Sequence, residues 1–412
     1  MKDGSSRRDL LVGAAAAGAG LLANGLRAGD APRKARPTTP ADPTKLLGRD
    51  PSDLGERSPF VEPRRHVGKA APSGDSETPL HDLHGILTPA DLHYERHHAG
   101  VPSIDPDRYS LLIHGMVERE TVFELRDLKR FPSLSLIRFL ECSGNGRTAY
   151  MEIKPDKSPQ QLDGLTSTSE WTGVPLKTLF DEVGIKPGAS WFLAESHDAC
   201  VYARSIPLEK GLDDAMIAYG QNGEPLRPEQ GYPARLFLPG WEGSTNIKWL
   251  RRIEVADRPF MTREETSKYT DPLANGTARI FSFVMDAKSV ITFPTFPSLL
   301  PDRGFWEISG IAWSGRGRIS RVDVSADGGR SWRPAELQEP VLPKCHTRFR
   351  CPWEWDGREA LLMSRATDET GYVQPTLAEL RKSRGPGTTY HFNHIRAWRV
   401  HRDGHVSFGL EG

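Results

Sequence analysis

The sequence has no surplus of charge of either sign. Lys plus Arg and Asp plus Glu each total 54 among 412 residues. Nucleic-acid binding depends on clustered positive charge, so this balance argues against a nucleic-acid partner and favours a small neutral substrate or a protein. The length exceeds that of one ordinary domain and predicts two folded domains with a tail.

Cysteine is scarce, with only Cys142, Cys200, Cys345 and Cys351. No Cys-x-x-Cys-His stretch occurs, which argues against a covalently attached c-type haem. Cys345 and Cys351 are near enough in sequence for a short disulfide loop in an oxidising compartment, but spacing alone leaves that pairing open. A structural zinc site would need more thiols or histidines at short separations, so it is weakly supported.

Long apolar runs are also missing. The Ala/Gly-rich run Leu10–Leu22 has 13 residues, fewer than the roughly 20 that span a bilayer as a helix. Because Arg7 and Arg8 precede it, we predict that residues 1–31 are a twin-arginine-type export signal. That route exports proteins already folded around a cofactor, so we expect a periplasmic protein without a membrane span after cleavage. The alternative is a plain secretory peptide with two incidental arginines.

Proline, by contrast, is frequent between Pro32 and Pro79, where nine occur among charged and small residues. We expect residues 32–79 to form a linker or an arm, with folded sequence from Leu80.

Two kinds of folded sequence follow. In residues 80–270, short apolar runs such as Ser110–Ile113 alternate with helix-like stretches such as Pro175–Val183, which predicts a mixed α/β domain. In residues 271–412, Ile319–Ser325 alternates in polarity and leads into an Asp-Gly-Gly turn, and helix-forming sequence is confined to about Thr376–Lys382. We therefore predict an immunoglobulin-like β-sandwich there and an α+β fold class overall.

Cys142 stands in the stretch Leu140–Arg147, where an apolar run ends in a glycine-rich bend and an arginine. A lone cysteine after Phe139 and Leu140 is most often a small buried hydrophobe. Glycines, however, let backbone N–H groups approach an anion, and an arginine favours the thiolate, which is a soft metal ligand. As a nucleophile Cys142 would need a base, for which the sequence offers His97, His98 and His197 without a diagnostic spacing.

Two further stretches concentrate polar groups. Tyr94–Pro102 holds an arginine and two histidines before the first clear strand, which predicts anion binding or, alternatively, a solvated loop. Asn246–Leu250 places Lys248 beside apolar residues, where the ordinary interpretation is a lysine that reaches solvent from a surface strand.

These stretches resemble, in order, motifs of the sulfite oxidase family of molybdopterin enzymes. The matches extend from about residue 90 to 400. They comprise Arg96-His97-His98, Val101-Pro102, Cys142–Arg147, Trp171–Leu176, Ser205–Leu208, Asn222–Leu226, Gly231–Arg235, Ile247–Leu250, Ala312–Gly315, Val322–Ser325 through Gly328-Gly329, and Val373–Pro375.

The resemblance implies a molybdenum ion held by the dithiolene of a pterin, with Cys142 as the single protein ligand. It implies that Arg96, Arg147 and Tyr269 line the substrate pocket. It implies that the following residues bind the cofactor: Arg96, His97, His98, Cys142, Asp198, Gln230, Arg235, Asn246, Ile247 and Lys248. The C-terminal sandwich would pair two protomers.

Two positions depart from the family pattern. Gln230 stands where a pterin-binding histidine is usual, and Tyr390–Asn393 replaces a stretch with an arginine, so one anion-binding charge is missing.

Within the family, the signal, the absence of a haem motif and the phrase Glu265–Asp271 are most similar to molybdenum subunits of sulfane dehydrogenases. That resemblance implies sulfane sulfur on a carrier protein as substrate, a c-type cytochrome subunit as electron acceptor, and a homodimer within a heterotetramer. The alternatives are a sulfite dehydrogenase with the same cofactor, and a secreted binding protein that has lost its chemistry.

Overall fold

The computed structural model describes residues 42–45, 47–151, 154–273, 275–385 and 387–409. The predicted export signal, residues 1–31, lies outside the described residues. The chain divides into two units, Met1–Ser58 and Pro59–Gly412, and the second contains everything discussed below. In the first, the short 3-10 helix Pro43–Lys45 is the described regular element. No helix in the described part of the chain is both long and apolar enough to cross a membrane.

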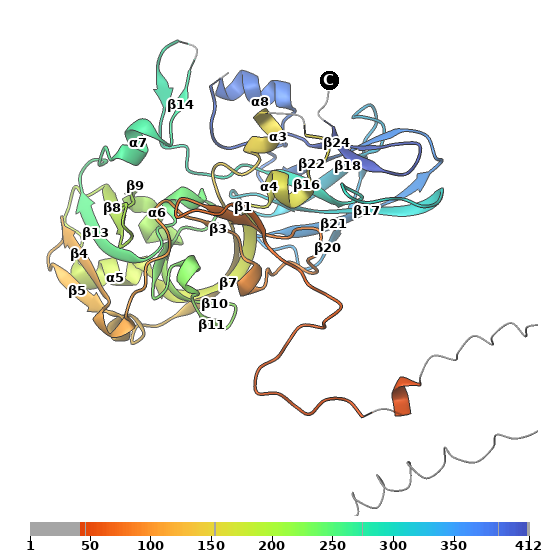
Figure 1. The fold of residues 1–412 in the computed structure, drawn as a ribbon. Coiled ribbons are helices and arrows are strands. Elements are labelled where there is room, and N and C mark those ends of the chain that lie inside the picture. The colour runs from red at the N-terminus through yellow and green to blue at the C-terminus, as the bar shows by residue number, and fades with distance from the viewer. Residues whose placement is uncertain (1–41, 46, 152–153, 274, 386, 410–412) are drawn as a thin grey trace, which may run out of the picture. The chain divides into compact units, whose positions relative to one another are not determined.

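The N-terminal half of the larger unit contains two five-stranded sheets (Figure 1). Their strands are β4 Ser110–Gly115, β5 Thr121–Glu124, β6 Leu134–Glu141, β7 Thr166–Pro175, β8 Trp191–Ser196, β9 Ala203–Pro207, β10 Met216–Gln221, β11 Glu224–Pro225, β12 Arg235–Phe237 and β13 Leu250–Ala256. One sheet has the order β11-β10-β7-β6 with β12 on β10, and the other has the order β5-β4-β13-β8-β9. In the second sheet β13 is parallel to β4 and antiparallel to β8.

Short helices lie between or after these strands in the chain. They are α2 Leu125–Leu128, α3 Arg147–Met151, α4 Pro159–Asp163, α5 Leu176–Val183, α6 Leu208–Asp213 and α7 Arg263–Ser267. Helix α5, where the sequence predicted one, buries Leu176, Leu179, Phe180 and Val183. This i, i+3, i+4, i+7 spacing puts one apolar face on the core that both sheets share.

The C-terminal half is a pair of packed sheets. Its strands are β16 Lys288–Phe293, β17 Gly304–Trp313, β18 Ile319–Ser325, β19 Arg333–Pro334, β20 Glu336–Gln338, β21 Thr347–Trp355, β22 Ala360–Asp368, β23 Ala397–Val400 and β24 Val406–Gly409. The sheet orders are β16-β17-β21-β20 and β19-β18-β22-β23-β24. A small hairpin of β14 Asp271–Pro272 and β15 Ala278–Arg279 precedes them.

The predicted helix near Thr376 is α8, Leu377–Arg384. It begins with a capping box in which the Thr376 hydroxyl accepts from the Glu379 N–H and the Glu379 carboxylate accepts from the Thr376 N–H. Leu380 on α8 packs with Tyr150 of α3 and with Phe392, so α8 lies against the N-terminal half (Figure 1).

The expectation that folded sequence begins at Leu80 is wrong. A three-stranded sheet forms from β1 His66–Lys69, β2 Asp75–Glu77 and β3 Glu95–Arg96. Strands β1 and β2 are short and charged, without apolar alternation, so pairing with residues farther along the chain defines them.

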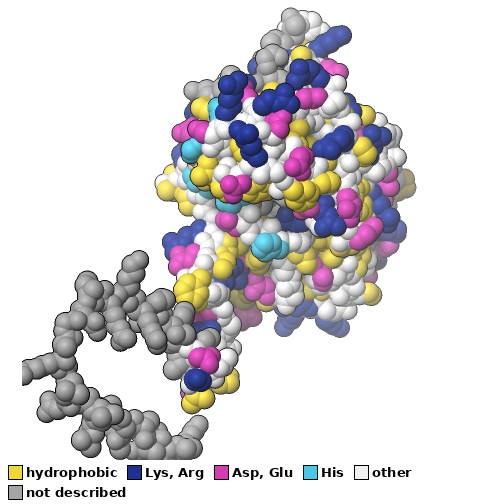
Figure 2. Space-filling view, turned by 90° about the vertical axis from the view of Figure 1, so that its right-hand side faces the viewer, with side chains coloured by type: hydrophobic (Ala, Val, Ile, Leu, Met, Phe, Trp, Pro, Cys, Tyr) yellow, Lys and Arg dark blue, Asp and Glu magenta, His cyan; other side chains and the backbone are white. Residues whose placement is uncertain are grey.

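The surface matches the charge balance of the sequence. On the face drawn in Figure 2, Lys and Arg side chains are interspersed with Asp and Glu side chains.

Candidate active site

Cys142 follows directly on β6, and α3 begins five residues later at Arg147. The bend between them is closed by two backbone hydrogen bonds, from Asn145 N–H to the Cys142 carbonyl (2.9 Å) and from Arg147 N–H to the Gly144 carbonyl (3.2 Å). The Cys142 side chain is partly exposed and lines two adjoining chambers.

The inner chamber encloses about 630 Å³ of space between its walls, part of which is open to solvent. Its walls come from the ends of β3, β6 and β8 and from the segments around β12 and η5 (Gly243–Thr245). They include the following residues: Arg96, His97, His98, Cys142, Asp198, Tyr202, Gln230, Arg235, Asn246, Ile247, Lys248 and Tyr269.

The outer chamber has a volume of about 1270 Å³ and shares Arg96, His98, Cys142, Tyr202 and Tyr269 with the inner one. Residues that line only the outer chamber include Asp75, Glu77, Gly144, Arg147, Gln160, Gln161, Arg263, Lys268 and Tyr390.

Every residue singled out from the sequence therefore lines one or both chambers. Arg147 is in the outer chamber, four residues line both (Arg96, His98, Cys142 and Tyr269), and the rest line the inner chamber. His197, which was offered only as a possible base, lines neither of them.

The Tyr94–Pro102 stretch is not a solvated loop. Tyr94 and His97 are buried, and the Lys248 ammonium, rather than reaching solvent, donates to His97 Nδ1 (2.8 Å) and to the carbonyls of Arg96 (3.1 Å) and Glu229 (3.0 Å). His97 Nε2 lies 2.8 Å from a carboxylate oxygen of Glu95, which assigns the ring proton to Nε2. Burial and the charge of Arg235 lower the pKa of Lys248 to about 7.

Arg235 is 1% exposed and lies under the inner chamber. Its Nη1 and Nη2 donate to the carbonyls of Gln230 (3.0 Å) and Asn246 (3.1 Å), while its buried Nε has no hydrogen-bond partner within the described residues. Burial lowers its pKa to about 10, so the guanidinium remains charged at neutral pH. A buried cation with a free N–H is suited to an anionic group in the chamber.

The other predicted inner-chamber residues are fixed by the fold. Asn246 accepts from the Leu238 N–H (2.7 Å), and Gln230 donates to the Tyr94 carbonyl (2.9 Å). Asp198 accepts from the Ser196 hydroxyl (2.9 Å) and the Cys200 thiol (3.0 Å). These contacts hold the chamber walls in place before any ligand enters.

Aromatic rings form the wall between the chambers. The His98 ring stacks on Tyr202 with centroids 4.9 Å apart, and its Nε2 lies 3.4 Å from the Tyr269 hydroxyl. Burial and the charge of Arg96 lower the pKa of His98 to about 4, so it is neutral at physiological pH. Tyr390, from the C-terminal half, packs on Tyr269 at 4.8 Å and completes the outer wall.

Opposing effects act on the pKa of the Cys142 thiol. Burial raises the pKa of the thiol, whereas the Gly144 N–H and the charges of Arg96 and Arg147 act to lower it. The effect of burial is the largest, so the pKa of the thiol is raised and the two arginines alone do not produce a thiolate. A bound metal ion would, because a coordinating thiol is deprotonated outright.

From the sequence, Gly146 was expected to let a backbone N–H group approach an anion, but its lack of a side chain also makes room for neighbouring residues. Its φ is +92°, and a Cβ there would lie 2.3 Å from Arg396 Nη2 and 2.9 Å from Asp163 Oδ1. The residue therefore makes room for a buried ion pair, and both it and Gly144 line the outer chamber.

The sequence did not single out Tyr390, Tyr202 or the Asp75–Glu77 pair as site residues. Asp75 and Glu77 point the same way from β2, and only the pairing of β2 with β3 brings them to the outer chamber. The only signal for Tyr390 was its place in a stretch that departs from the family pattern.

The structure does not support the alternative disulfide or the alternative zinc site. All four cysteines are free, so Cys345 and Cys351 are not bonded to each other. No group of three or more His, Cys, Asp or Glu side chains suitable for a metal occurs among the described residues, which leaves the zinc alternative without a ligand set.

Comparison with known families gives two matches. Residues 98–264 match the oxidoreductase molybdopterin binding domain, and residues 279–397 match the Mo-co oxidoreductase dimerisation domain.

A solved structure, that of the sulfane dehydrogenase SoxCD from Paracoccus pantotrophus, is 44% identical to this chain with a TM-score of 0.86. The match covers 89% of this chain and 96% of that one. The resemblance and the fold class expected from the sequence are thus confirmed.

More distant relatives include mitochondrial sulfite oxidase from Mus musculus, 28% identical over 84% of this chain and 68% of that protein. A nitrate reductase [NADH] from Phaseolus vulgaris is 31% identical over 74% of this chain. The chain spans only 38% of that nitrate reductase.

Proposed function

The chain belongs to the sulfite oxidase family of molybdopterin oxidoreductases, and from this premise we propose that it oxidises sulfane sulfur carried on a partner protein. The observation that carries the proposal is the place of Cys142. It offers one thiol at the junction of a cationic inner chamber and a wider outer chamber whose lining includes Arg96 and Arg147.

The residues of the inner chamber fit a pterin with a phosphate. The buried Nε of Arg235 has no hydrogen-bond partner among the described residues. Lys248 adds a second basic group, whose pKa is lowered by burial and by the charge of Arg235 although Glu95, Asp198 and Glu229 act to raise it. We propose that the cofactor is held by the inner-chamber set His97, His98, Asp198, Gln230, Arg235, Asn246, Ile247 and Lys248, together with Arg96. Cys142 is then the metal ligand.

When bound, the molybdenum cofactor supplies two-electron oxygen-transfer chemistry to sulfur. The chain's own residues do the rest. Arg96 and Arg147 hold negative charge on the substrate sulfur group, and Tyr269 offers a hydroxyl beside the neutral ring of His98. The tyrosine walls exclude water, which strengthens these charge interactions.

The outer chamber supports a protein-bound substrate over a free dianion. Its wall includes the uncharged ring of Tyr390, in a stretch where the family pattern has an arginine, so it has one cation fewer for a free dianion than that pattern would give. The wide opening suits a short arm from a carrier protein.

The remaining parts of the proposal concern the cellular setting. We propose a periplasmic location, a c-type cytochrome subunit as electron acceptor, and a homodimer formed through the C-terminal sandwich within a heterotetramer. We also propose that residues 80–270, together with strands β1 and β2 that precede them, and residues 271–412 are the catalytic and dimerisation domains. The relation to SoxCD and the dimerisation match of residues 279–397 support this arrangement.

A metal analysis with matched variants tests the cofactor. Protein exported by a host with an intact cofactor pathway should contain about one molybdenum per chain. Cys142→Ser should fold but lose turnover, by about a hundredfold or more. Cys200→Ser is the control, because a serine hydroxyl can keep the bond to Asp198. Wild-type protein without molybdenum, or full activity in Cys142→Ser, would support a binding protein instead.

A sulfite dehydrogenase is the second candidate, favoured by Arg96 and Arg147 in the outer chamber and by the 28% identity to sulfite oxidase. Steady-state assays separate the two functions. Fast turnover of free sulfite together with indifference to a persulfide-bearing carrier protein would replace the first proposal with the second.

A further inference from the structure

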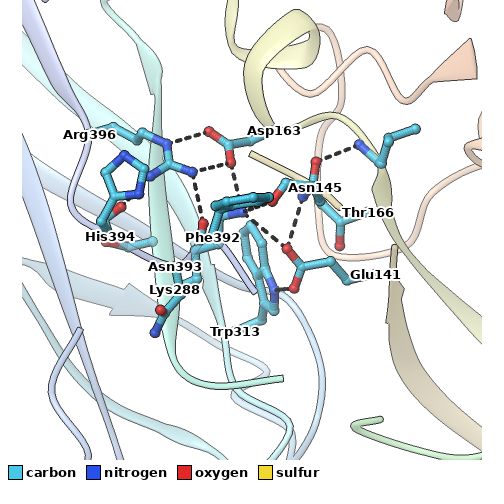
Figure 3. Close-up of polar contacts among 12 residues, drawn as sticks. Glu141, Asn145, Asp163, Thr166, Lys288, Trp313, Phe392, Asn393, His394 and Arg396 are labelled. Atoms are coloured by element: carbon cyan, nitrogen blue, oxygen red, sulfur yellow. Dashed lines mark hydrogen bonds and ion pairs between the residues drawn. The ribbon is translucent and has the colours of Figure 1, made fainter. Parts of the chain in front are cut away.

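Glu141, the residue before Cys142, is fully buried, and the C-terminal sandwich binds its carboxylate (Figure 3). Lys288 Nζ lies 3.1 Å from Oε1, and the indole N–H of Trp313 donates to Oε2 at 2.7 Å. Asn145, within the Cys142 bend, donates its side-chain N–H to Oε1 at 2.9 Å. The base of the bend is therefore attached to β16 and β17.

Lys288 also contacts a second buried carboxylate. Its Nζ lies 2.7 Å from Asp163 Oδ1, and Asp163 accepts two hydrogen bonds from Arg396, both of 2.9 Å. Glu141, Asp163, Lys288 and Arg396 are each no more than 2% exposed. Two negative and two positive side chains thus balance, and Lys288 is the one that bridges both carboxylates (Figure 3).

Lys288 holds the bend at both ends. Besides the Glu141 carboxylate before the cysteine, it reaches the Asn145 carbonyl after it, at 3.4 Å. The Asn145 side chain in turn accepts from the Leu165 N–H (3.0 Å), and the Cys142 N–H donates to the Leu165 carbonyl (2.9 Å). The backbone on either side of the sulfur is fixed with little freedom to turn.

We propose that Lys288 is a positioning residue for Cys142, so that the direction of the metal-ligating sulfur is set by the C-terminal sandwich. This inference rests on the proposed function. Without the ammonium, two desolvated carboxylates would face each other across the place that it occupied. Because breaking one partner of a buried ion network leaves an uncompensated charge, the bend must shift to separate them. A shift of even a fraction of an ångström at a catalytic ligand reduces rate steeply.

The test compares holoenzymes by a measurement that an ordinary stability defect does not change. The electron paramagnetic resonance spectrum of the one-electron-reduced molybdenum depends on the orientation of its cysteine sulfur. In Lys288→Met we expect shifted or heterogeneous g values, a fall in kcat of about ten- to a hundredfold, and a KM within about threefold of wild type. Lys288→Arg, which can contact both carboxylates, should recover much of the wild-type spectrum.

Lys210→Met is the matched control. Lys210 is a buried lysine, 5% exposed, that pairs with Asp214 and lines neither chamber. Its loss should lower the unfolding temperature but leave the g values and kcat unchanged. A folded, metal-loaded Lys288→Met enzyme with the wild-type spectrum and kcat would overturn the inference, although the proposed function would stand.

Trp313→Phe decides the matter if Lys288→Met does not fold. It keeps all four charges but removes the indole N–H that donates to Glu141 Oε2 and replaces the ring whose centre lies 5.6 Å from Lys288 Nζ. A displaced spectrum in this variant supports the inference, and an unchanged spectrum overturns it. Wild-type protein that lacks molybdenum would instead show that the proposed function has failed.

Discussion

Arg147 and Tyr390, from opposite halves of the chain, meet at the outer chamber. The Arg147 guanidinium carbon lies 5.4 Å from the centre of the Tyr390 ring, and Nη2 donates to the Thr389 carbonyl at 2.7 Å. The C-terminal half therefore supplies an aromatic ring and a backbone carbonyl that both contact the Arg147 guanidinium beside Cys142. The segment is tied to the Cys142 bend as well, because the His391 N–H donates to the Ser143 carbonyl (2.8 Å).

Removing the Tyr390 ring should weaken substrate binding. In Tyr390→Ala the Arg147 guanidinium loses a cation–π contact of about 0.5 to 2 kcal/mol, so we expect KM for the carrier-bound substrate to rise about two- to thirtyfold. Tyr390→Phe keeps the ring and should remain within about twofold of wild type. Steady-state kinetics measure both variants, and an unchanged KM in Tyr390→Ala would show that Arg147 does not need the ring.

Lys248 should be required for retention of the cofactor. Lys248→Met removes an ammonium from the inner chamber, and we expect bound molybdenum and pterin to fall about ten- to a hundredfold after gel filtration. Lys268→Met is the control, since Lys268 lines only the outer chamber and should keep the cofactor. Equal cofactor content in the two variants would remove Lys248 from the proposed cofactor site.

The lowered pKa of Lys248 also predicts that cofactor binding depends on pH. The pKa of Lys248 is lowered to about 7 by burial and by the charge of Arg235, and an anion bound beside it would raise that pKa. Binding then takes up a proton, so cofactor affinity should fall as pH rises above about 7. Isolated protein held at pH 6.5 and at pH 9 should differ in the rate of pterin loss, followed by pterin fluorescence. This difference should disappear in Lys248→Met.

The sequence predicted which residues line the two chambers better than it predicted the contacts that fix those residues in place. Cys142, Arg96 and Lys248 stand in short local motifs, and such motifs can be recognised without a structure. The network of Lys288 could not be found this way, because it joins Glu141 to β16 across a large separation in sequence. A signal was nevertheless present, since Glu141 directly follows Phe139 and Leu140 at the end of β6, and Lys288 begins a strand that contains Val290 and Ile291. Buried charges in such places are almost always paired.

The missed strands β1 and β2 illustrate a second limit. Their sequences, His-Val-Gly-Lys and Asp-Ser-Glu, have no apolar alternation, and their backbone bonds depend on β3. Local propensity therefore cannot predict them, because tertiary pairing alone makes them strands. Two residues of the outer chamber, Asp75 and Glu77, were missed for this reason.

Glu77 should make the protein less stable as pH rises. Burial and the neighbouring Asp75 raise its pKa to about 8. Between about pH 4.5 and 8 the folded state thus holds a proton that the unfolded state has released, so the free energy of unfolding decreases with pH across this window. Glu77→Gln removes the cost of ionisation. Its free energy of unfolding relative to wild type should be higher at pH 8.5 than at pH 5, by an amount on the order of 1 to 3 kcal/mol.

Asp75→Asn provides the matched variant for this prediction. Without the Asp75 charge, the pKa of Glu77 should fall toward its ordinary value, so the decrease in stability with pH should become smaller than in wild type. Thermal unfolding of the three proteins at several pH values measures the effect. Parallel curves for wild type and Glu77→Gln would contradict the prediction.

Gly146 should be among the least replaceable residues of the Cys142 bend. A Cβ at this position would lie 2.3 Å from Arg396 Nη2 and 2.9 Å from both Asp163 Oδ1 and the Phe392 carbonyl, so Gly146→Ala must displace the ion pair that balances Lys288. Gly223→Ala is the control, because Gly223 also has a positive φ, of +82°, but a Cβ there would meet nothing within 4 Å. We expect the control to lose about 1 kcal/mol of stability and Gly146→Ala to lose about 3 kcal/mol or more. Chemical denaturation measures the difference, and equal losses would mean that backbone strain alone fixes the bend.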